Sequence, residues 1–256
     1  MGGRPRPAAS EADATAGREP PAEARYAAGA ALQVETAPER AERFGRVFER
    51  VRYARTRRVN ATHNGTFTSA SGAGSTLAYT TAARRVLAQV VHDFAVKRLL
   101  DVPCGDFVRM RHFLKARPAL EYVGGDIVRA LVDEHSANFA DRAPRWRFLR
   151  VDAAEALPRG PFDVLLMRDA VQHMSPGDIL RVLAHVNASA VRYLLVTHYP
   201  SQQTNAMRRG ADAARWDTHF PNLCRPPYSL PEPLRSYNDR DQKDLSLFRV
   251  PFLPAG

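Results

Sequence analysis

Three aspartates follow three apolar runs at nearly equal spacing: Asp101, Asp126 and Asp152 are 25 and 26 residues apart. That interval fits one strand followed by one helix. If the apolar runs are parallel strands, their carboxyl ends meet at one edge of a sheet, where ligands bind in open α/β folds. Carboxylates at that edge accept hydrogen bonds from hydroxyls and attract cations. The spacing therefore predicts a site for a ligand that carries hydroxyl groups and a positive charge.

The first aspartate opens a turn with the sequence DVPCGD, residues 101–106. Pro103 and Gly105 are expected to bend the chain off the strand, and Gly105 allows a ligand to approach the backbone closely. A dinucleotide site needs the pattern G-x-G-x-x-G here to hold its pyrophosphate. This turn lacks that pattern and carries two acids, which disfavours a nicotinamide-dependent reductase.

Apolar runs and amphipathic stretches alternate around these aspartates. This alternation predicts a Rossmann-like, doubly wound, mostly parallel sheet with helices on both faces. Two extended segments, 226–234 and 245–250, flank a polar turn at 238–244 and predict an antiparallel hairpin at the sheet edge. Seven strands are expected in all. The five parallel strands are expected at 98–102, 121–127, 146–152, 162–169 and 192–199, and helices at 77–96, 107–114, 128–139 and 175–186.

The segment before the predicted sheet differs in composition. Residues 1–40 are rich in Ala, Pro, Glu, Gly and Arg and nearly lack large apolar side chains, which predicts a disordered tail. Residues 41–256 are predicted to form one domain. Within it, residues 41–76 are expected to form a helix and a loop, and residues 199–230 an irregular insert or lid.

Composition limits the classes of function. The 256 residues contain two cysteines, too few for a disulfide framework or a cysteine-spaced zinc site, and no metal is expected. No apolar run is long enough to span a bilayer and no secretory signal is apparent, so no membrane partner and a cytoplasmic location are expected. The net charge of +10 leaves nucleic-acid binding open. The arginines are scattered, however, so a small-molecule substrate is preferred. The sequence does not indicate the oligomeric state.

Four segments resemble the motifs of class I S-adenosylmethionine-dependent methyltransferases. They are LLDVPCGDF at 99–107, YVGGDI at 122–127, FLRVDA at 148–153 and FDVLLMRDAVQHMS at 162–175. The D-x-P-C-G-D form resembles an uncharacterised branch that also has a G-S-T loop upstream and a P-E-P-L segment downstream, here at 74–76 and 231–234. The usual first motif is E/D-x-G-x-G-x-G. This chain keeps one of its glycines, Gly105, and has Pro103 in place of the first.

The resemblance implies S-adenosylmethionine as cofactor and a role for each matching position. Asp126 is expected to accept hydrogen bonds from both ribose hydroxyls, and Asp152 to lie near the adenine amino group. Asp101 is expected near the amino group of the methionine portion. The full set of implied cofactor residues is Ser75, Thr76, Asp101, Gly105, Asp126, Asp152, Ala153 and Arg168.

Catalysis is expected just after the fourth strand, where the family places residues near the methyl group. Asp169 and His173 are four residues apart, so they share one face if a helix begins that early. His173 is then predicted to act as general base with Asp169 orienting it. The alternative is that His173 caps or packs at the start of the helix. His198, beyond the fifth strand, is a second candidate base.

The acceptor is expected to be a hydroxyl of a sugar or another small molecule. Two alternatives stay open. The charge of +10 is compatible with an RNA methyltransferase or RNA-binding protein. A protein that binds the cofactor without catalysis would keep the same sheet and the same acids.

Overall fold

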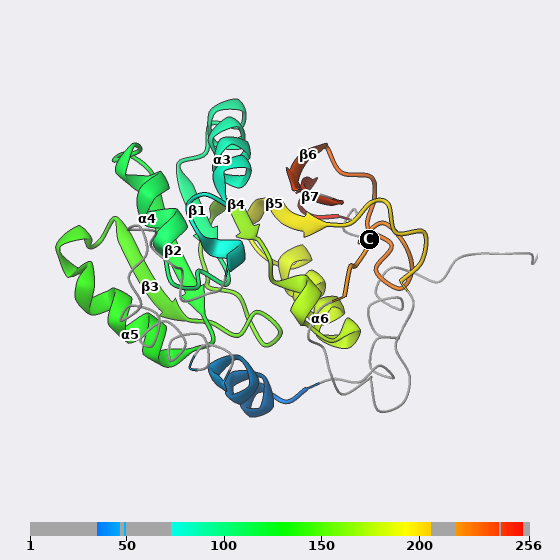
Figure 1. The fold of residues 1–256 in the computed structure, drawn as a ribbon, viewed down its shortest axis with the longest axis horizontal. Coiled ribbons are helices and arrows are strands. Elements are labelled where there is room, and N and C mark those ends of the chain that lie inside the picture. The colour runs from blue at the N-terminus through cyan, green and yellow to red at the C-terminus, as the bar shows by residue number, and fades with distance from the viewer. Residues whose placement is uncertain (1–34, 47–48, 50–72, 206–218, 241, 253–256) are drawn as a thin grey trace, which may run out of the picture.

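A computed structural model of the chain describes residues 35–46, 49, 73–205, 219–240 and 242–252. Its centre is one seven-stranded sheet with the strand order β3-β2-β1-β4-β5-β7-β6 (Figure 1). The strands are β1 (Arg98–Asp101), β2 (Glu121–Asp126), β3 (Trp146–Arg150), β4 (Phe162–Met167), β5 (Val191–His198), β6 (Arg235–Arg240) and β7 (Lys243–Arg249).

Strands β1 to β5 are parallel, and β7 runs antiparallel to both β5 and β6. The α-helices around the sheet are α3 (Thr81–Asp93), α4 (Val108–Lys115), α5 (Arg129–Asn138) and α6 (Pro176–Asn187), and a further helix covers 37–46. The predicted fold class, a Rossmann-like sheet with a C-terminal antiparallel hairpin, is confirmed.

The alternation of side chains along β1 shows why both faces of the sheet are covered. Leu99 and Leu100 are adjacent, point to opposite faces, and are both fully buried. Leu99 packs in one cluster with apolar residues of α3 and α4, whereas Leu100 packs in another with apolar residues of α6. Helices therefore lie on both faces, as the alternation of strands and helices predicted.

Local capping sets the start of α6. The Ser175 hydroxyl accepts a hydrogen bond from the Asp178 amide at 3.1 Å, and Pro176 occupies the first helical turn. A hydroxyl at the N-cap and proline in the first turn are the preferred residues there. The residues S-P-G-D at 175–178 are the sequence pattern of such a cap, with Ser at the N-cap and Asp at the third helical position, and the helix predicted from residue 175 is observed.

The C-terminal hairpin lies at the predicted edge, but its first strand differs from the prediction. β6 covers Arg235–Arg240, whereas the prediction placed that arm at 226–234 and assigned residues 238–240 to the turn. β6 is an edge strand with mostly exposed side chains, so it lacks the apolar pattern that marks an inner strand. α3 also starts later than predicted, at Thr81 in place of residue 77, because residues 76–80 form turns.

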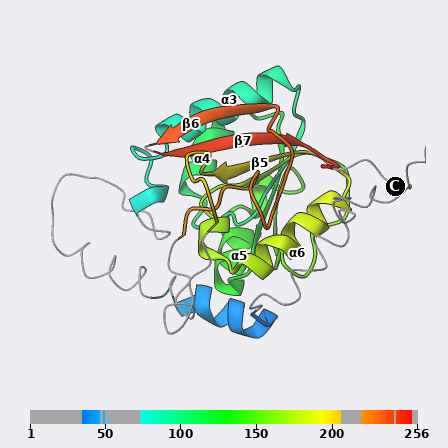
Figure 2. The same cartoon turned by 90° about the vertical axis from the view of Figure 1, so that its right-hand side faces the viewer.

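The start of the folded domain is also earlier than predicted. Helix 37–46 crosses the expected tail boundary at residue 40, and the Arg40 side chain is only 3% exposed. Figures 1 and 2 show this helix, drawn in blue, against the part of the domain that contains α5 and α6. Residues 1–34 of the tail expected over 1–40, and most of the loop expected before residue 76, lie outside the described residues.

The predicted insert at 199–230 is irregular in its described parts, 199–205 and 219–230. Those parts are not detached from the domain, because Leu223, Tyr228 and Leu230 belong to the same apolar cluster as α6. Residues 206–218 of the insert are outside the described part of the chain. Among the described helices, none has the length and hydropathy required to cross a membrane.

Candidate active site at the carboxyl edge of the sheet

A cavity of about 810 Å³ opens at the carboxyl ends of the parallel strands. Its lining comes from the segments that follow β1, β2, β3 and β4, from helix 37–46, and from the hairpin β6–β7. This volume is within the range of sites that hold a cofactor-sized ligand, roughly 300–1,000 Å³. Ligands are expected at this edge in a sheet of this type.

Asp126 lies at the end of β2 and lines the cavity. One carboxylate oxygen accepts the Gly105 amide at 3.0 Å, and the other accepts the Val128 amide at 2.9 Å. Each oxygen keeps acceptor capacity, since a carboxylate has about four acceptor sites in all. Burial raises the pKa of Asp126, and the two amides act against that rise. The carboxylate is thus aligned by the backbone and able to accept two further donors.

The turn after β1 supplies one of those amides. Gly105 has φ of +57°, a left-handed conformation that glycine adopts without strain. His135 of α5 contacts the same turn, and its Nε2 lies 2.8 Å from the Gly105 carbonyl oxygen. Gly105 therefore lies in the cavity wall, and its expected contact with the methionine portion stays a prediction.

Asp101 is fully buried at the end of β1 and is not one of the residues that line the cavity. Its carboxylate receives Arg109 Nη2 at 3.3 Å and the Tyr122 hydroxyl at 3.0 Å. Burial raises its pKa, opposed by the charge of Arg109. Arg109 lines the cavity. The expected contact of Asp101 with the methionine portion stays a prediction, because Asp101 itself does not line the cavity and its partner Arg109 does.

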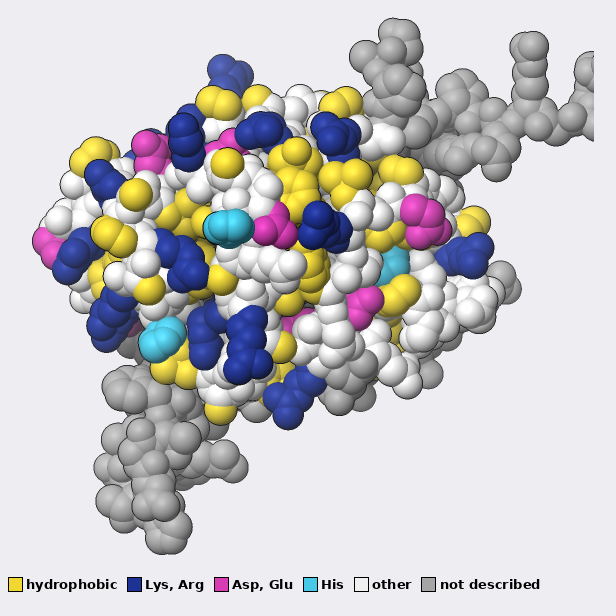
Figure 3. Space-filling model, turned by 90° about the horizontal axis from the view of Figure 1, so that it is seen from above, with side chains coloured by type: hydrophobic (Ala, Val, Ile, Leu, Met, Phe, Trp, Pro, Cys, Tyr) yellow, Lys and Arg dark blue, Asp and Glu magenta, His cyan; other side chains and the backbone are white. Residues whose placement is uncertain are grey.

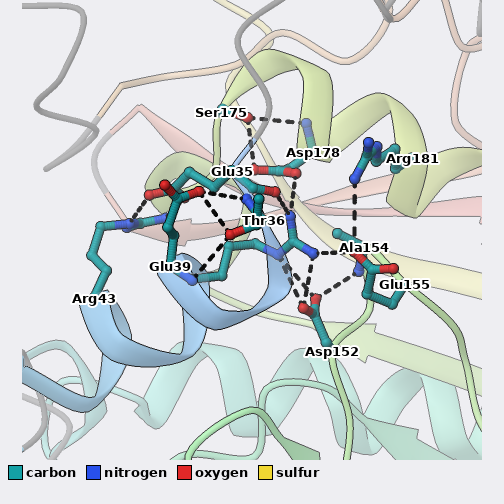
Figure 4. A network of polar contacts seen from close by, with 11 residues as sticks. Glu35, Thr36, Glu39, Arg43, Asp152, Ala154, Glu155, Ser175, Asp178 and Arg181 are labelled. Atoms are coloured by element: carbon teal, nitrogen blue, oxygen red, sulfur yellow. Dashed lines mark hydrogen bonds and ion pairs between the residues drawn. The ribbon is translucent and has the colours of Figure 1, made fainter.

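Asp152 follows β3, and Figure 4 shows it near helix 37–46, beside Ala154 and Glu155. Its ion-pair partner is Arg40 of that helix. Arg40 Nε donates to Asp152 Oδ2 at 3.0 Å, and Arg40 Nη2 lies 2.9 Å from the same oxygen. The Ala154 amide donates to the other oxygen at 3.1 Å. Asp152 lines the cavity together with Ala153 and Arg40. Helix 37–46 is therefore part of the wall beside the expected adenine acid.

Arg40 also pairs with two further carboxylates. Its Nη1 donates to Asp178 Oδ1 at 2.8 Å, and its Nη2 lies 2.5 Å from Glu155 Oε1. Asp178 is fully buried, whereas Glu155 is half exposed. Burial opposes the charge of Arg40, but the surrounding carboxylates raise its pKa overall. Arg40 thus joins helix 37–46 to α6 and to the segment after β3.

The region after β4 carries a second ion cluster, formed by Arg168, Asp169, Asp239 and Lys243. Arg168 Nη1 lies 2.6 Å from Asp169, and Arg168 Nε donates to Asp239 at 2.9 Å. Lys243 Nζ lies 2.7 Å from Asp169 and 3.3 Å from Asp239. Burial acts to raise the pKa of Asp169, but the charges of Arg168 and Lys243 exceed that effect and lower it. Asp169 is therefore held ionised.

Asp169 and His173 both line the cavity, but not on one turn of a regular helix. Asp169 has φ of +55°, and Val171–His173 form a short 3-10 turn before α6 begins at Pro176. The hydrogen-bond and ion-pair partners of Asp169 include Gln172 as well as Arg168 and Lys243. The Arg43 guanidinium donates to the His173 carbonyl at 3.0 Å. The premise of an early helix start is thus wrong, because the chain turns left-handed at Asp169.

Other predicted residues fall on both sides of the cavity boundary. Ser75 and Arg168 line the cavity, whereas Thr76 does not and instead accepts the Tyr79 amide on its hydroxyl at 3.3 Å. His198 is buried away from the lining, and burial lowers its pKa to about 4. His198 is therefore neutral at pH 7 and lies away from the cavity.

Sequence reasoning missed several side chains that line the cavity. Arg40 lay at the end of the expected tail, and Lys243 lay in the expected hairpin turn. The aromatic residues were also missed, because a single tyrosine or phenylalanine in a loop carries no spacing signal. The cavity-lining residues that the sequence did not indicate include Arg40, Tyr79, Arg109, Tyr199, Phe220, Arg240 and Lys243.

Two features are relevant to nucleic-acid and metal binding: the distribution of basic side chains and the grouping of metal-ligand residues. On the face shown in Figure 3, Lys and Arg side chains are distributed among hydrophobic and acidic ones, and the described atoms there form no continuous basic stripe. Within the described residues, no three His, Cys, Asp or Glu side chains are grouped as a metal site requires.

Residues 99–190 match the family model of a methyltransferase domain. The fold is similar to that of the mitomycin 7-O-methyltransferase MmcR, with 18% identity, 68% of this chain and 54% of that chain covered, and a TM-score of 0.51. It is also similar to the pyocyanin biosynthetic protein PhzM, with 15% identity, 66% and 55% covered, and a TM-score of 0.50.

A third similar structure is the methyltransferase domain of bacterial CtHen1-CN, with 11% identity, 67% and 100% covered, and a TM-score of 0.50. At these identities the likeness shows the fold alone. This chain spans about half the length of the mitomycin and pyocyanin proteins. No curated protein matches it in sequence.

Proposed function

We propose that this chain is an S-adenosylmethionine-dependent methyltransferase that transfers a methyl group to a hydroxyl of a small molecule, and the match of residues 99–190 to the model of a methyltransferase domain supports this. One observation carries the proposal. Asp126, at the end of the second strand, points its backbone-aligned carboxylate into a cavity of about 810 Å³. That carboxylate fits a vicinal diol, because two aligned oxygens accept two hydroxyl donors.

The polar groups around the cavity fit the rest of S-adenosylmethionine. Asp152 and the backbone at Ala153 would face the adenine, and the Gly105 turn with Arg109 and Ser75 would hold the methionine portion. Arg109 carries a charge that suits a carboxylate, and Asp101 behind it keeps that guanidinium in place at 3.3 Å. When bound, this cofactor supplies a methyl on a sulfonium: a bond forms between the acceptor oxygen and the methyl carbon, the carbon–sulfur bond breaks, and S-adenosylhomocysteine leaves.

The chain's own contribution is alignment, exclusion of water and removal of a proton. Oriented reactants can lower a barrier by roughly 7–11 kcal/mol. Arg168 is 1% exposed and anchors Asp169 at the cavity wall, which keeps this wall rigid. Asp169 is a weak base here, because its pKa is lowered. We therefore assign the proton of the acceptor hydroxyl to His173, which lines the same cavity.

His173→Ala tests that assignment. It should lower turnover by about 10²–10⁴-fold, the usual effect of losing a general base, and leave the affinity for S-adenosylhomocysteine nearly unchanged. His112→Ala is the matched control, because His112 is exposed on α4 and does not line the cavity. The assay screens glycans, small hydroxylated compounds and RNA with a labelled methyl donor. If His173→Ala turns over at the wild-type rate, His173 is not the general base, and catalysis depends on alignment of the reactants.

Two other functions predict different results in the labelling screen and in binding measurements. An RNA methyltransferase or RNA-binding protein would bind RNA with an affinity that falls steeply as salt rises, because the net charge of +10 would neutralise phosphates. A non-catalytic cofactor-binding protein would bind S-adenosylmethionine but label no acceptor. We favour the small molecule because the site is a cavity of about 810 Å³ and the basic side chains on the face in Figure 3 are scattered.

A further inference from the structure

Two aromatic side chains form a wall at the mouth of the cavity. The rings of Tyr199 and Phe220 are 4.9 Å apart, and both residues line the cavity. Tyr199 is 7% exposed, whereas Phe220 is 52% exposed and is the one aromatic among the large hydrophobic residues exposed in the described chain. The two neighbouring rings offer the cavity a flat apolar surface, which favours contact with another aromatic ring.

Cations gather at the same end of the cavity, around the ring of Tyr79. The Arg240 guanidinium lies 4.3 Å from the ring centroid, and Lys243 Nζ and the Arg168 guanidinium carbon lie 5.5 and 6.0 Å from it. Tyr199 lines the same cavity as Tyr79, Arg240 and Lys243. The aromatic wall and the cations therefore face one space.

The three cations differ in how they are neutralised. Arg168 and Lys243 share the carboxylates of Asp169 and Asp239, so their charges are matched within the protein. Arg240 is exposed at the end of β6 and lines the cavity, and it forms no ion pair with any carboxylate of the described residues. Arg240 is thus the cation at this end with a charge available for a ligand.

We propose that the methyl acceptor is a hydroxylated aromatic compound with an anionic substituent, its ring against Tyr199 and Phe220 and its anion on Arg240. This inference rests on the proposed function and specifies its substrate class. A neutral sugar would instead need free carboxylates or amides for its several hydroxyls. At this end both oxygens of Asp169 are paired with Arg168 and Lys243, and Asp239 pairs with the same two cations through Oδ2 and does not line the cavity.

The test uses the full chain saturated with S-adenosylhomocysteine, and calorimetry with three probes. They are 4-hydroxybenzoate, its neutral amide 4-hydroxybenzamide, and glucuronate as an anionic sugar. We expect 4-hydroxybenzoate to bind about tenfold more tightly than the amide, the scale of one charge-assisted hydrogen bond, with an advantage that shrinks as salt rises. Glucuronate should bind more weakly than 4-hydroxybenzoate, since it offers no flat apolar face.

Two variants separate the anion contact from the ring contact. Arg240→Gln should remove the preference for 4-hydroxybenzoate over its amide and leave S-adenosylhomocysteine affinity unchanged. Arg235→Gln is the matched control, because it removes the same charge from the other end of β6, where Arg235 pairs with Asp93 at 3.3 Å. Phe220→Ala should weaken both aromatic probes by a similar factor. Phe220 is half exposed, so this change leaves the fold intact.

The inference is overturned if wild type binds the acid and the amide equally, if glucuronate binds more tightly than 4-hydroxybenzoate, or if Arg235→Gln and Arg240→Gln act alike. It is also overturned if no probe binds while S-adenosylhomocysteine does, and the methyltransferase proposal then stands without it. If S-adenosylhomocysteine itself does not bind, the proposed function fails and this inference fails with it.

Discussion

Asp126 and Asp152 end neighbouring parallel strands and line the same cavity, yet different parts of the chain hold them. Asp126 receives two backbone amides, from Gly105 and Val128, both within the sheet's own turns. Asp152 receives one backbone amide, from Ala154, and its other partner is the guanidinium of Arg40, which is 112 residues away in the N-terminal helix. The first acid is therefore positioned by the fold alone, whereas the second depends on a segment that the sheet does not contain.

This difference separates two roles for buried charge. A carboxylate held by amides keeps its position without a counter-ion, and it can give its remaining acceptor sites to a ligand. A carboxylate held by a buried arginine is part of an ion network that must stay complete, because one unpaired member leaves a charge in a medium of low dielectric. The proposed ribose contact at Asp126 should therefore tolerate changes in helix 37–46, whereas the proposed adenine contact at Asp152 should not.

The largest expected effect is on stability, from Arg40→Ala. This change leaves the fully buried Asp178 and the mostly buried Asp152 without their cationic partner. It should lower the free energy of unfolding by about 3–5 kcal/mol, the scale for breaking a buried ion pair. Denaturant unfolding measures it. Arg46→Ala is the matched control, since Arg46 on the same helix forms an exposed pair with Glu42 and should cost less than about 1 kcal/mol.

An equal decrease in the free energy of unfolding in Arg40→Ala and Arg46→Ala would show that the Arg40 ion network around Asp152 does not stabilise the domain. The same comparison decides where the domain starts. Deleting residues 1–34 should leave stability nearly unchanged, and a deletion that ends after Arg40 should match Arg40→Ala.

The second effect is on cofactor affinity, from Asp126→Ala. Losing hydrogen bonds to a charged group should weaken S-adenosylhomocysteine binding by roughly 1.5–3 kcal/mol, about 10- to 150-fold. Calorimetry measures it, with Asp133→Ala as control because Asp133 is exposed on α5. Unchanged affinity for S-adenosylhomocysteine in Asp126→Ala would show that this carboxylate does not contact the cofactor. The comparison of Asp126 with Asp152 as two cofactor contacts would then be wrong.

The smallest effect is a pH dependence specific to Asp126. Burial raises the pKa of this carboxyl, so it takes up a proton at a higher pH than an ordinary aspartate does. Hydroxyl donors need the ionised form, so affinity for S-adenosylhomocysteine should be constant above that pKa and fall below it, by at most about tenfold per pH unit. Titrations from pH 7 to pH 4 on wild type and Asp126→Asn measure it. An identical pH profile in the variant would assign the titration to another group.

The contrast also explains which parts were predictable from sequence. The strand-end acids and the Ser175 cap depend on residues within one strand-plus-helix unit, and local spacing revealed them. Arg40 was missed because it is one arginine among many and its partners lie 112 to 138 residues away. The early helix start was wrong because the left-handed turn at Asp169, φ +55°, has no glycine to mark it. The strand β6 was misplaced because an exposed edge strand carries no apolar alternation.

The most direct test of the central claim is calorimetry of the full-length wild-type protein with S-adenosylmethionine, S-adenosylhomocysteine and NAD. The first two should each bind at one site, and NAD should not bind, because the turn after β1 presents Asp106 and one glycine where a pyrophosphate needs several glycines. Binding of NAD, or failure of both S-adenosyl compounds to bind a protein that is shown to be folded, would contradict the assignment of this cavity to a methyl donor.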